Sequence, residues 1–318
     1  MQGLLIERIK TFFRQIREQM STFDAYFTRG GELYNDGKYQ LAVEFFKIAL
    51  KQSNAESYAN YNLALAYQQL NKDSDAIKHY EKFLQDYPFD QNSLYNIALI
   101  HYKKNEFEEA ATYFAESFKY KQDEENVKAL AETYLQLGDV EKASELADYI
   151  FNSDCNKKYA MLIAQVFESK DHLAQDFSLT QKALDIYLKL LELQPGNFDA
   201  ALAASVAYSK MGDWDNAIKY CNFALELKPK SYEANNQMGL VLYCSDNMPE
   251  SIAFYERAMQ IKKDYKIYLN LAYAYEKANM LEESIQLFKE TLTRYTNFPQ
   301  KEEVRKHVRQ LMEKEKAN

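Results

Sequence analysis

The chain has 318 residues, of which only 8 are glycine and 5 are proline, and its formal net charge at pH 7 is −8. Glycine and proline supply most tight turns, so their scarcity disfavours turn-rich all-β folds and favours long helices joined by short turns. The negative charge disfavours a general nucleic-acid binder, which needs a basic face. The three cysteines, Cys155, Cys221 and Cys244, are too scattered for a disulfide framework, which favours a reducing compartment.

Residues 1–22 are predicted to form an amphipathic helix with an apolar stripe. Four basic and two acidic residues give this segment a net charge of +2. We favour a helix that covers the start of the following array, because the ends of stacked helices need covering. The alternative is a helix that contacts a membrane or docks on a partner. Charges interrupt every apolar run here, so neither a signal peptide nor a spanning helix is predicted, and a cytoplasmic location is expected.

An internal repeat of about 34 residues occupies most of the chain. Small residues recur inside apolar runs at Ala42, Ala76, Ala110, Ala143, Ala183, Ala217, Ser251 and Ser284. A second set, of residues that tolerate a left-handed backbone, recurs with the same spacing a few positions before the small residues. Its members are Gly37, Asn71, Asn105, Gly138, Gly212, Asp246 and Asn279. Apolar residues recur at helical spacing on both sides of each such turn. The sequence therefore predicts a repeated helix–turn–helix unit.

Eight such units are predicted between residues 23 and 298. Their ranges are 23–56, 57–90, 91–123, 124–156, 157–197, 198–231, 232–264 and 265–298. The fifth unit carries a seven-residue insertion, which we expect to bulge between Lys170 and Thr180. Residues 299–318 predict a C-terminal capping helix, with Val304, Val308 and Leu311 on one face.

The unit at residues 57–90 resembles the tetratricopeptide repeat family. Ala64, Tyr67, Ala76, Tyr80 and Pro88 stand where that family has a small residue, an aromatic, an alanine, an aromatic and a proline. Small residues let paired helices approach closely, and the aromatics fill the space toward the next unit. The resemblance implies an all-α, right-handed superhelix (an α-solenoid) with capping helices at both ends.

Motifs for catalysis, cofactors or metals are not found. There is no phosphate- or dinucleotide-binding glycine motif, no H-E-x-x-H and no C-x-x-C, so we expect no enzyme activity, no cofactor and no metal. Cys221 and Cys244 are interpreted as buried or half-buried hydrophobic residues, and Gly30-Gly31 as a point of close packing. The hydroxyls of Ser251 and Ser284 are expected to bond to the carbonyl four residues earlier.

The resemblance also implies which residues line a concave face made by the first helices. The middle units contribute polar residues, namely Lys128, Glu132, Gln165, Glu168 and Lys210, whereas the first three units contribute mainly aromatic ones. The candidate peptide-binding residues are Tyr58, Tyr61, Asn62, Leu65, Tyr95, Asn96, Leu99, Tyr102, Gln237 and Asn270.

The asparagines among these candidates are interpreted through the same family. Family members that hold extended peptides clamp the ligand backbone with asparagine at the position of Asn62, Asn96 and Asn270, because an amide offers both a donor and an acceptor. The alternative is that these side chains bond neighbouring helices. Of the carboxylate clamp that chaperone-binding members use, only Asn62 matches, so an acidic chaperone tail is disfavoured as a ligand.

We expect a non-catalytic scaffold or adaptor that holds a peptide or protein segment in the concave groove. Tyr58, Tyr61, Leu65, Tyr95 and Leu99 would be its hydrophobic anchors. The alternative is a structural component of a secretion, motility or envelope machine, which docks through its termini or self-associates.

Overall fold

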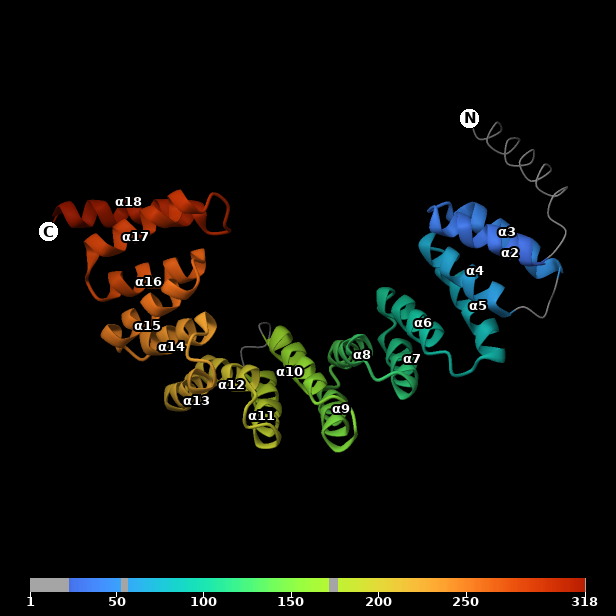
Figure 1. Cartoon of the computed structure of the whole chain (residues 1–318), viewed down its shortest axis with the longest axis horizontal. Helices are drawn as coiled ribbons and strands as arrows, with labels where there is room; N and C mark the ends of the chain where they lie inside the picture. The colour runs from blue at the N-terminus through green and yellow to red at the C-terminus, as the bar shows by residue number, and fades with distance from the viewer. Residues whose placement is uncertain (1–22, 53–56, 172–176, 318) are drawn as a thin grey trace, which may run out of the picture. The chain divides into compact units, whose positions relative to one another are not determined.

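The computed structural model describes residues 23–52, 57–171 and 177–317, so the helix expected at residues 1–22 lies outside the described residues. Within the described ranges the protein is all-α, with 17 helices and no strand (Figure 1). The chain divides after Leu146 into two compact units, which are described separately below.

The first unit is a series of helices that pack in sequential pairs: α2 packs on α3, α4 on α5, and α6 on α7. Its helices are α2 (Phe23–Asn35), α3 (Tyr39–Gln52), α4 (Ser57–Gln69), α5 (Asp73–Asp86), α6 (Gln91–Lys103), α7 (Phe107–Tyr120) and α8 (Glu124–Gln136). Helix α9 (Val140–Asn152) crosses the division.

The second unit repeats the same pairing, with α10 on α11, α12 on α13, α14 on α15, and α16 on α17. Its helices are α10 (Lys158–Asp171), α11 (Ser178–Leu193), α12 (Phe198–Lys210), α13 (Trp214–Leu227), α14 (Tyr232–Cys244), α15 (Met248–Ile261), α16 (Tyr265–Lys277), α17 (Leu281–Arg294) and α18 (Lys301–Ala317). Helix α10 extends to Asp171 and α11 begins at Ser178, and most of the bulge expected between Lys170 and Thr180 lies outside the described residues.

The turns inside the helix pairs have a left-handed residue at each position that the sequence predicted. These residues are Gly37, Asn71, Asn105, Gly138, Gly212, Asp246 and Asn279, with φ between 54° and 78°. The left-handed residue ends the first helix of the pair, because it brings the next amide back to a carbonyl of the last helical turn. In α4, for example, the Lys72 amide donates to the Tyr67 carbonyl at 2.9 Å. Phe177, with φ of 56°, is a left-handed position that the sequence did not predict.

Small residues set the approach of paired helices. Gly30 of α2 faces the Phe46 ring of α3 so closely that an added Cβ would lie 2.6 Å from ring carbons. Gly239 of α14 has the same relation to the Tyr255 ring of α15. The packing role expected of Gly31 is wrong, because an added Cβ there would meet no atom within 4 Å.

The two serines that replace alanine do not bond as expected. The Ser251 hydroxyl donates to the Gly239 carbonyl at 2.7 Å, across the helix pair, instead of to the carbonyl four residues earlier. The buried Ser284 hydroxyl has no hydrogen-bond partner in the described part of the chain.

One of the two cysteines differs from the expectation that both are buried or half-buried. Cys221 is buried as expected, whereas Cys244, the last residue of α14, is exposed.

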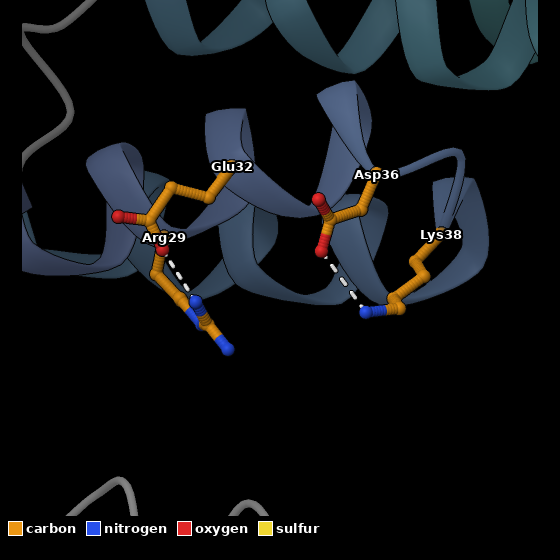
Figure 2. A network of polar contacts seen from close by, with 4 residues as sticks. All are labelled: Arg29, Glu32, Asp36 and Lys38. Atoms are coloured by element: carbon orange, nitrogen blue, oxygen red, sulfur yellow. Dashed lines mark hydrogen bonds and ion pairs between the residues drawn. The ribbon is translucent and has the colours of Figure 1, made fainter.

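The outer surface of the first helix pair carries exposed ion pairs (Figure 2). Arg29 pairs with Glu32 one turn along α2, and the Lys38 ammonium lies 2.9 Å from the Asp36 carboxylate beside the following turn. Pairs this exposed contribute at most about 1 kcal/mol to stability, since water already solvates both charges. The apolar core therefore holds this helix pair together.

Candidate functional site

A hollow of about 350 Å³ lies beside α6 and α8 in the first unit. We call it the α6–α8 pocket; its lining residues are Tyr95, Leu99, Tyr102, Phe114, Glu125, Lys128, Ala129 and Glu132. Three of the ten candidates, Tyr95, Leu99 and Tyr102, therefore come together in one place. They do so because residues four and seven positions apart fall on one face of a helix.

Both helices at this pocket begin at a capped residue. The Asp90 carboxylate accepts a hydrogen bond of 2.7 Å from the Ser93 amide at the start of α6. The Asp123 carboxylate accepts one of 3.0 Å from the Asn126 amide at the start of α8. Such caps satisfy amides that have no partner inside the helix, and so they fix where each helical face begins.

The aromatic rings of the pocket are held from behind by α7. The Tyr95 ring meets Phe114 edge to face, with ring centroids 5.2 Å apart. The Tyr102 ring meets Phe107 in the same way at 5.4 Å. Aromatic pairs of this geometry contribute about 0.5–1.5 kcal/mol beyond the area they bury. The rings are thus half-buried and positioned by their own protein.

The charges of the pocket come from α8. Burial raises the pKa of Tyr95, and the nearby carboxylates of Glu125, Asp123 and Glu132 raise it further, so its hydroxyl stays protonated and can donate. Lys128 is the one cation among the lining residues. Lys128 and Glu132, which the sequence assigned to the polar part of the groove, thus line the same pocket as Tyr95 of the aromatic part.

A second hollow of about 500 Å³ lies where α4, α5 and the turn into α6 meet. We call it the aromatic–acidic pocket; it is lined by Tyr58, Phe83, Asp86, Tyr87, Pro88, Phe89 and Asp90. Of the candidates only Tyr58 belongs to it. Sequence reasoning missed Tyr87 and Phe89, although two aromatic residues on either side of the helix-ending Pro88 were a usable signal.

Tyr61, Leu65 and the first two asparagines have mixed environments. The Tyr61 ring lies 5.2 Å from that of Phe83, and Leu65 packs on the core of the first unit. The Tyr80 hydroxyl donates to the Gln68 side-chain oxygen at 2.8 Å. Burial raises the pKa of Tyr80, and the nearby Asn96 side chain partly opposes this rise. Asn62 is half-buried.

Gln237 and Asn270 belong to the second unit, where the chain itself surrounds them. The Asn270 amide donates to the Asn236 side-chain oxygen at 3.0 Å, which joins α16 to α14. Gln237 is only 7% exposed, and its amide nitrogen has no partner among the described residues. For Asn270 the geometry therefore matches the alternative in which asparagine bonds a neighbouring helix.

Over the described ranges, no group of three or more histidine, cysteine, aspartate or glutamate side chains is arranged to hold a metal ion. His101 and His307 each bond one carboxylate, with nitrogen–oxygen distances of 2.7 Å to Glu106 and Glu276. In the same part of the chain, no helix has both the length and the apolar character needed to cross a membrane.

Three family models match the chain, over four ranges. A tetratricopeptide repeat model matches residues 27–90 and 202–265, and a second one matches residues 267–297. A model described as the anaphase-promoting complex (cyclosome) subunit 3 matches residues 70–146. The sequence resemblance to tetratricopeptide repeats is thereby confirmed.

Two curated proteins are similar over much of the chain. A TPR repeat-containing protein of Methanocaldococcus jannaschii is 23% identical over 332 residues, which cover 89% of this chain and 58% of that protein. The human protein O-mannosyl-transferase TMTC1 is 25% identical over 242 residues, covering 73% of this chain and 26% of that protein. The chain thus spans less than two thirds of either relative.

Among solved structures, a thermophilic TPR protein of Thermus thermophilus is 18% identical with a TM-score of 0.40, covering 70% of this chain and 98% of its own. A tetratricopeptide repeat protein of Parabacteroides merdae is 14% identical with a TM-score of 0.38. This match covers 91% of the present chain and 98% of the P. merdae chain.

Proposed function

Because the chain belongs to the tetratricopeptide repeat family, whose repeats serve as protein-interaction scaffolds, we propose that its first unit binds an extended segment of a partner protein at the α6–α8 pocket. The observation that carries this proposal is the gathering of Tyr95, Leu99 and Tyr102 in one hollow of about 350 Å³. A hollow of this size falls within the range of about 300–1,000 Å³ that is usual for ligand pockets.

The proposed binding mode follows from the lining. Tyr95, Leu99 and Tyr102 are the apolar anchors, since rigid aromatic residues contribute much of the energy of protein interfaces. Glu132 and Lys128 offer charged contacts at the same place. The protonated Tyr95 hydroxyl donates a hydrogen bond to a carbonyl of the bound segment. In this proposal the protein is a non-catalytic adaptor that acts in the cytoplasm.

Site-specific cross-linking tests this proposal. A photo-reactive amino acid replaces Leu99 in the full chain, and the control replaces Leu193, which is 54% exposed in the second unit. We expect one partner segment to be captured from Leu99 and not from Leu193. That segment, made synthetically, should then bind the unmodified chain and bind at least about tenfold more weakly after Tyr95→Ala. Equal capture from both positions, or unchanged affinity of Tyr95→Ala, would contradict the proposal.

A further inference from the structure

The aromatic–acidic pocket of the first unit exposes aromatic rings to solvent. Tyr58 is 53% exposed and Phe89 is 66% exposed, so two large rings at one pocket are open to solvent. Behind them, the Tyr58 and Phe83 rings lie 5.6 Å apart, and the Phe83 and Tyr87 rings stack at 4.7 Å. The Tyr58 ring therefore rests on an aromatic cluster, whereas the Phe89 ring packs against Tyr120 of α7, with ring centroids 5.1 Å apart.

The charges that line this pocket are both negative. The Asp86 carboxylate accepts a hydrogen bond from the Ser57 hydroxyl, and the Asp90 carboxylate accepts one from the Ser93 amide at 2.7 Å. These bonds fix the two carboxylates beside the rings. Burial raises the pKa of Tyr61, whose ring lies 5.2 Å from that of Phe83, and the charge of Asp90 raises it further.

The second unit contains a matched pocket of about 690 Å³, lined by Phe198, Asp199, Leu202, Lys228, Pro229, Lys230, Ser231 and Glu233. The two pockets correspond because Pro229 stands two residues after the end of α13, as Pro88 does after α5. Ser231 caps α14 as Asp90 caps α6. Lysines therefore stand in the second unit where the first unit has Tyr87 and Phe89.

In the matched pocket the chain supplies its own cation. The Lys228 ammonium lies 4.1 Å from the centre of the Phe198 ring, a distance typical of a cation–π contact. In the aromatic–acidic pocket, no cation of the described residues lies over the rings of Tyr58 or Phe89. In the described part of the chain, the rings of Tyr58 and Phe89 therefore share a pocket with two carboxylates and have no cation over them.

We propose that the aromatic–acidic pocket binds the side chain of an arginine carried by a segment of a partner protein. The planar guanidinium stacks on aromatic faces and donates hydrogen bonds to carboxylates in pairs, which matches the rings of Tyr58 and Phe89 beside Asp86 and Asp90. An ammonium is more strongly hydrated and lacks the planar face, so lysine binds more weakly. This inference uses no residue of the α6–α8 pocket and does not depend on binding there.

The test follows the ring resonances of the full chain, with phenylalanine and tyrosine labelled with ¹³C. The ligand added is the short peptide acetyl-Gly-Arg-Gly-amide, and the comparison peptide carries citrulline, which has the same shape without the charge. We expect the arginine peptide to shift the resonances of Tyr58 and Phe89, while the Phe198 resonance stays in place. Equal shifts with the citrulline peptide would overturn the proposal.

Paired charge-neutralising variants give the control. Asp86→Asn with Asp90→Asn removes both charges but keeps an acceptor for the Ser57 hydroxyl and a good cap for α6. We expect this variant to bind the arginine peptide about tenfold more weakly. Asp199→Asn with Glu233→Gln removes the same charge from the matched pocket, and it should leave the affinity unchanged. If both double variants lost the same affinity for the arginine peptide, the net charge of the protein would explain the binding, and the proposal would be overturned.

Two further variants separate the sources of the effect. Replacing Arg8, Arg14 and Arg17 by glutamine in the full chain should not change the affinity; tighter binding would make the chain's own arginines the occupant and overturn the assignment to a partner. Tyr95→Ala should also leave arginine-peptide binding intact. Its effect on the cross-linked partner segment is a separate result, so failure of one proposal is distinguishable from failure of the other.

Discussion

The hydroxyl of Ser251 donates a hydrogen bond of 2.7 Å to the backbone carbonyl of Gly239. This bond crosses from α15 to α14 at Gly239, where an added Cβ would lie 2.6 Å from the Tyr255 ring. Ser284 is also fully buried, but its hydroxyl has no such acceptor among the described residues.

The two serines therefore predict opposite responses to the same substitution. Ser251→Ala should destabilise the protein by about 1 kcal/mol, because the Gly239 carbonyl loses its cross-helix donor. Ser284→Ala should be neutral or slightly stabilising, since it removes a buried hydroxyl without a partner. Urea unfolding followed by circular dichroism measures both changes, and equal destabilisation by the two variants would refute this account.

Two adjacent glycines of α2 give a second matched pair. Gly30→Ala should destabilise by about 1–3 kcal/mol, because its Cβ would overlap the Phe46 ring. Gly31→Ala should stabilise by about 0.5–1 kcal/mol, because it has open space and alanine is the better helix former. Thermal unfolding of the two variants checks the prediction, which requires their shifts to have opposite sign.

His79 predicts a pH dependence of stability. Burial, with help from Lys82 and Lys78, lowers its pKa from 6.5 to about 4. As the pH falls, His79 is protonated in the unfolded chain before it is protonated in the folded one. The stability that neutral His79 gives the folded state is therefore fully present above pH 6.5 and is lost as the pH falls toward 4. We expect His79→Gln to flatten this part of the curve of urea midpoint against pH. If the urea midpoint of the unmodified protein and that of His79→Gln changed equally between pH 6.5 and 4, the lowered pKa of His79 would be contradicted.

The cysteines predict an order of chemical modification. Cys221 is fully buried, its thiol lies 3.3 Å from the Ala234 carbonyl, and burial raises its pKa to about 12. Cys244 is exposed at the end of α14, although partial burial still raises its pKa. Because the thiolate is the reactive form, iodoacetamide should label Cys244 in the native protein and reach Cys221 only after unfolding. Mass spectrometry of the peptides reads this order, and early labelling of Cys221 would disprove it.

The repeat register was predictable because its signals are local. The left-handed turns at Asn71 and Asp246 follow from residue type and spacing, and neither needs knowledge of tertiary contacts. The gathering of Tyr95, Leu99 and Tyr102 was predictable for the same reason, since all three belong to one helix.

Features that depend on packing between helices were beyond the sequence pattern. Gly30 and Gly31 look alike in sequence, yet only Gly30 faces a ring, because the rotation of α2 against α3 decides it. Tyr87 and Phe89 flank Pro88 and so gave a signal, but they follow the end of α5, where helical periodicity no longer says which way a side chain points. Similarly, the spacing of Asn270 could not reveal that Asn236 accepts its amide hydrogen bond.

The division of the chain after Leu146 falls inside α9, a continuous helix of 13 residues. A peptide of half that length is not helical in water, because too few hydrogen bonds offset the cost of the first turn. Expression of either unit as a truncated polypeptide should therefore retain α9 whole. A fragment that contains the second unit should begin at the turn at Gly138. A fragment that contains the first unit should end after Asn152.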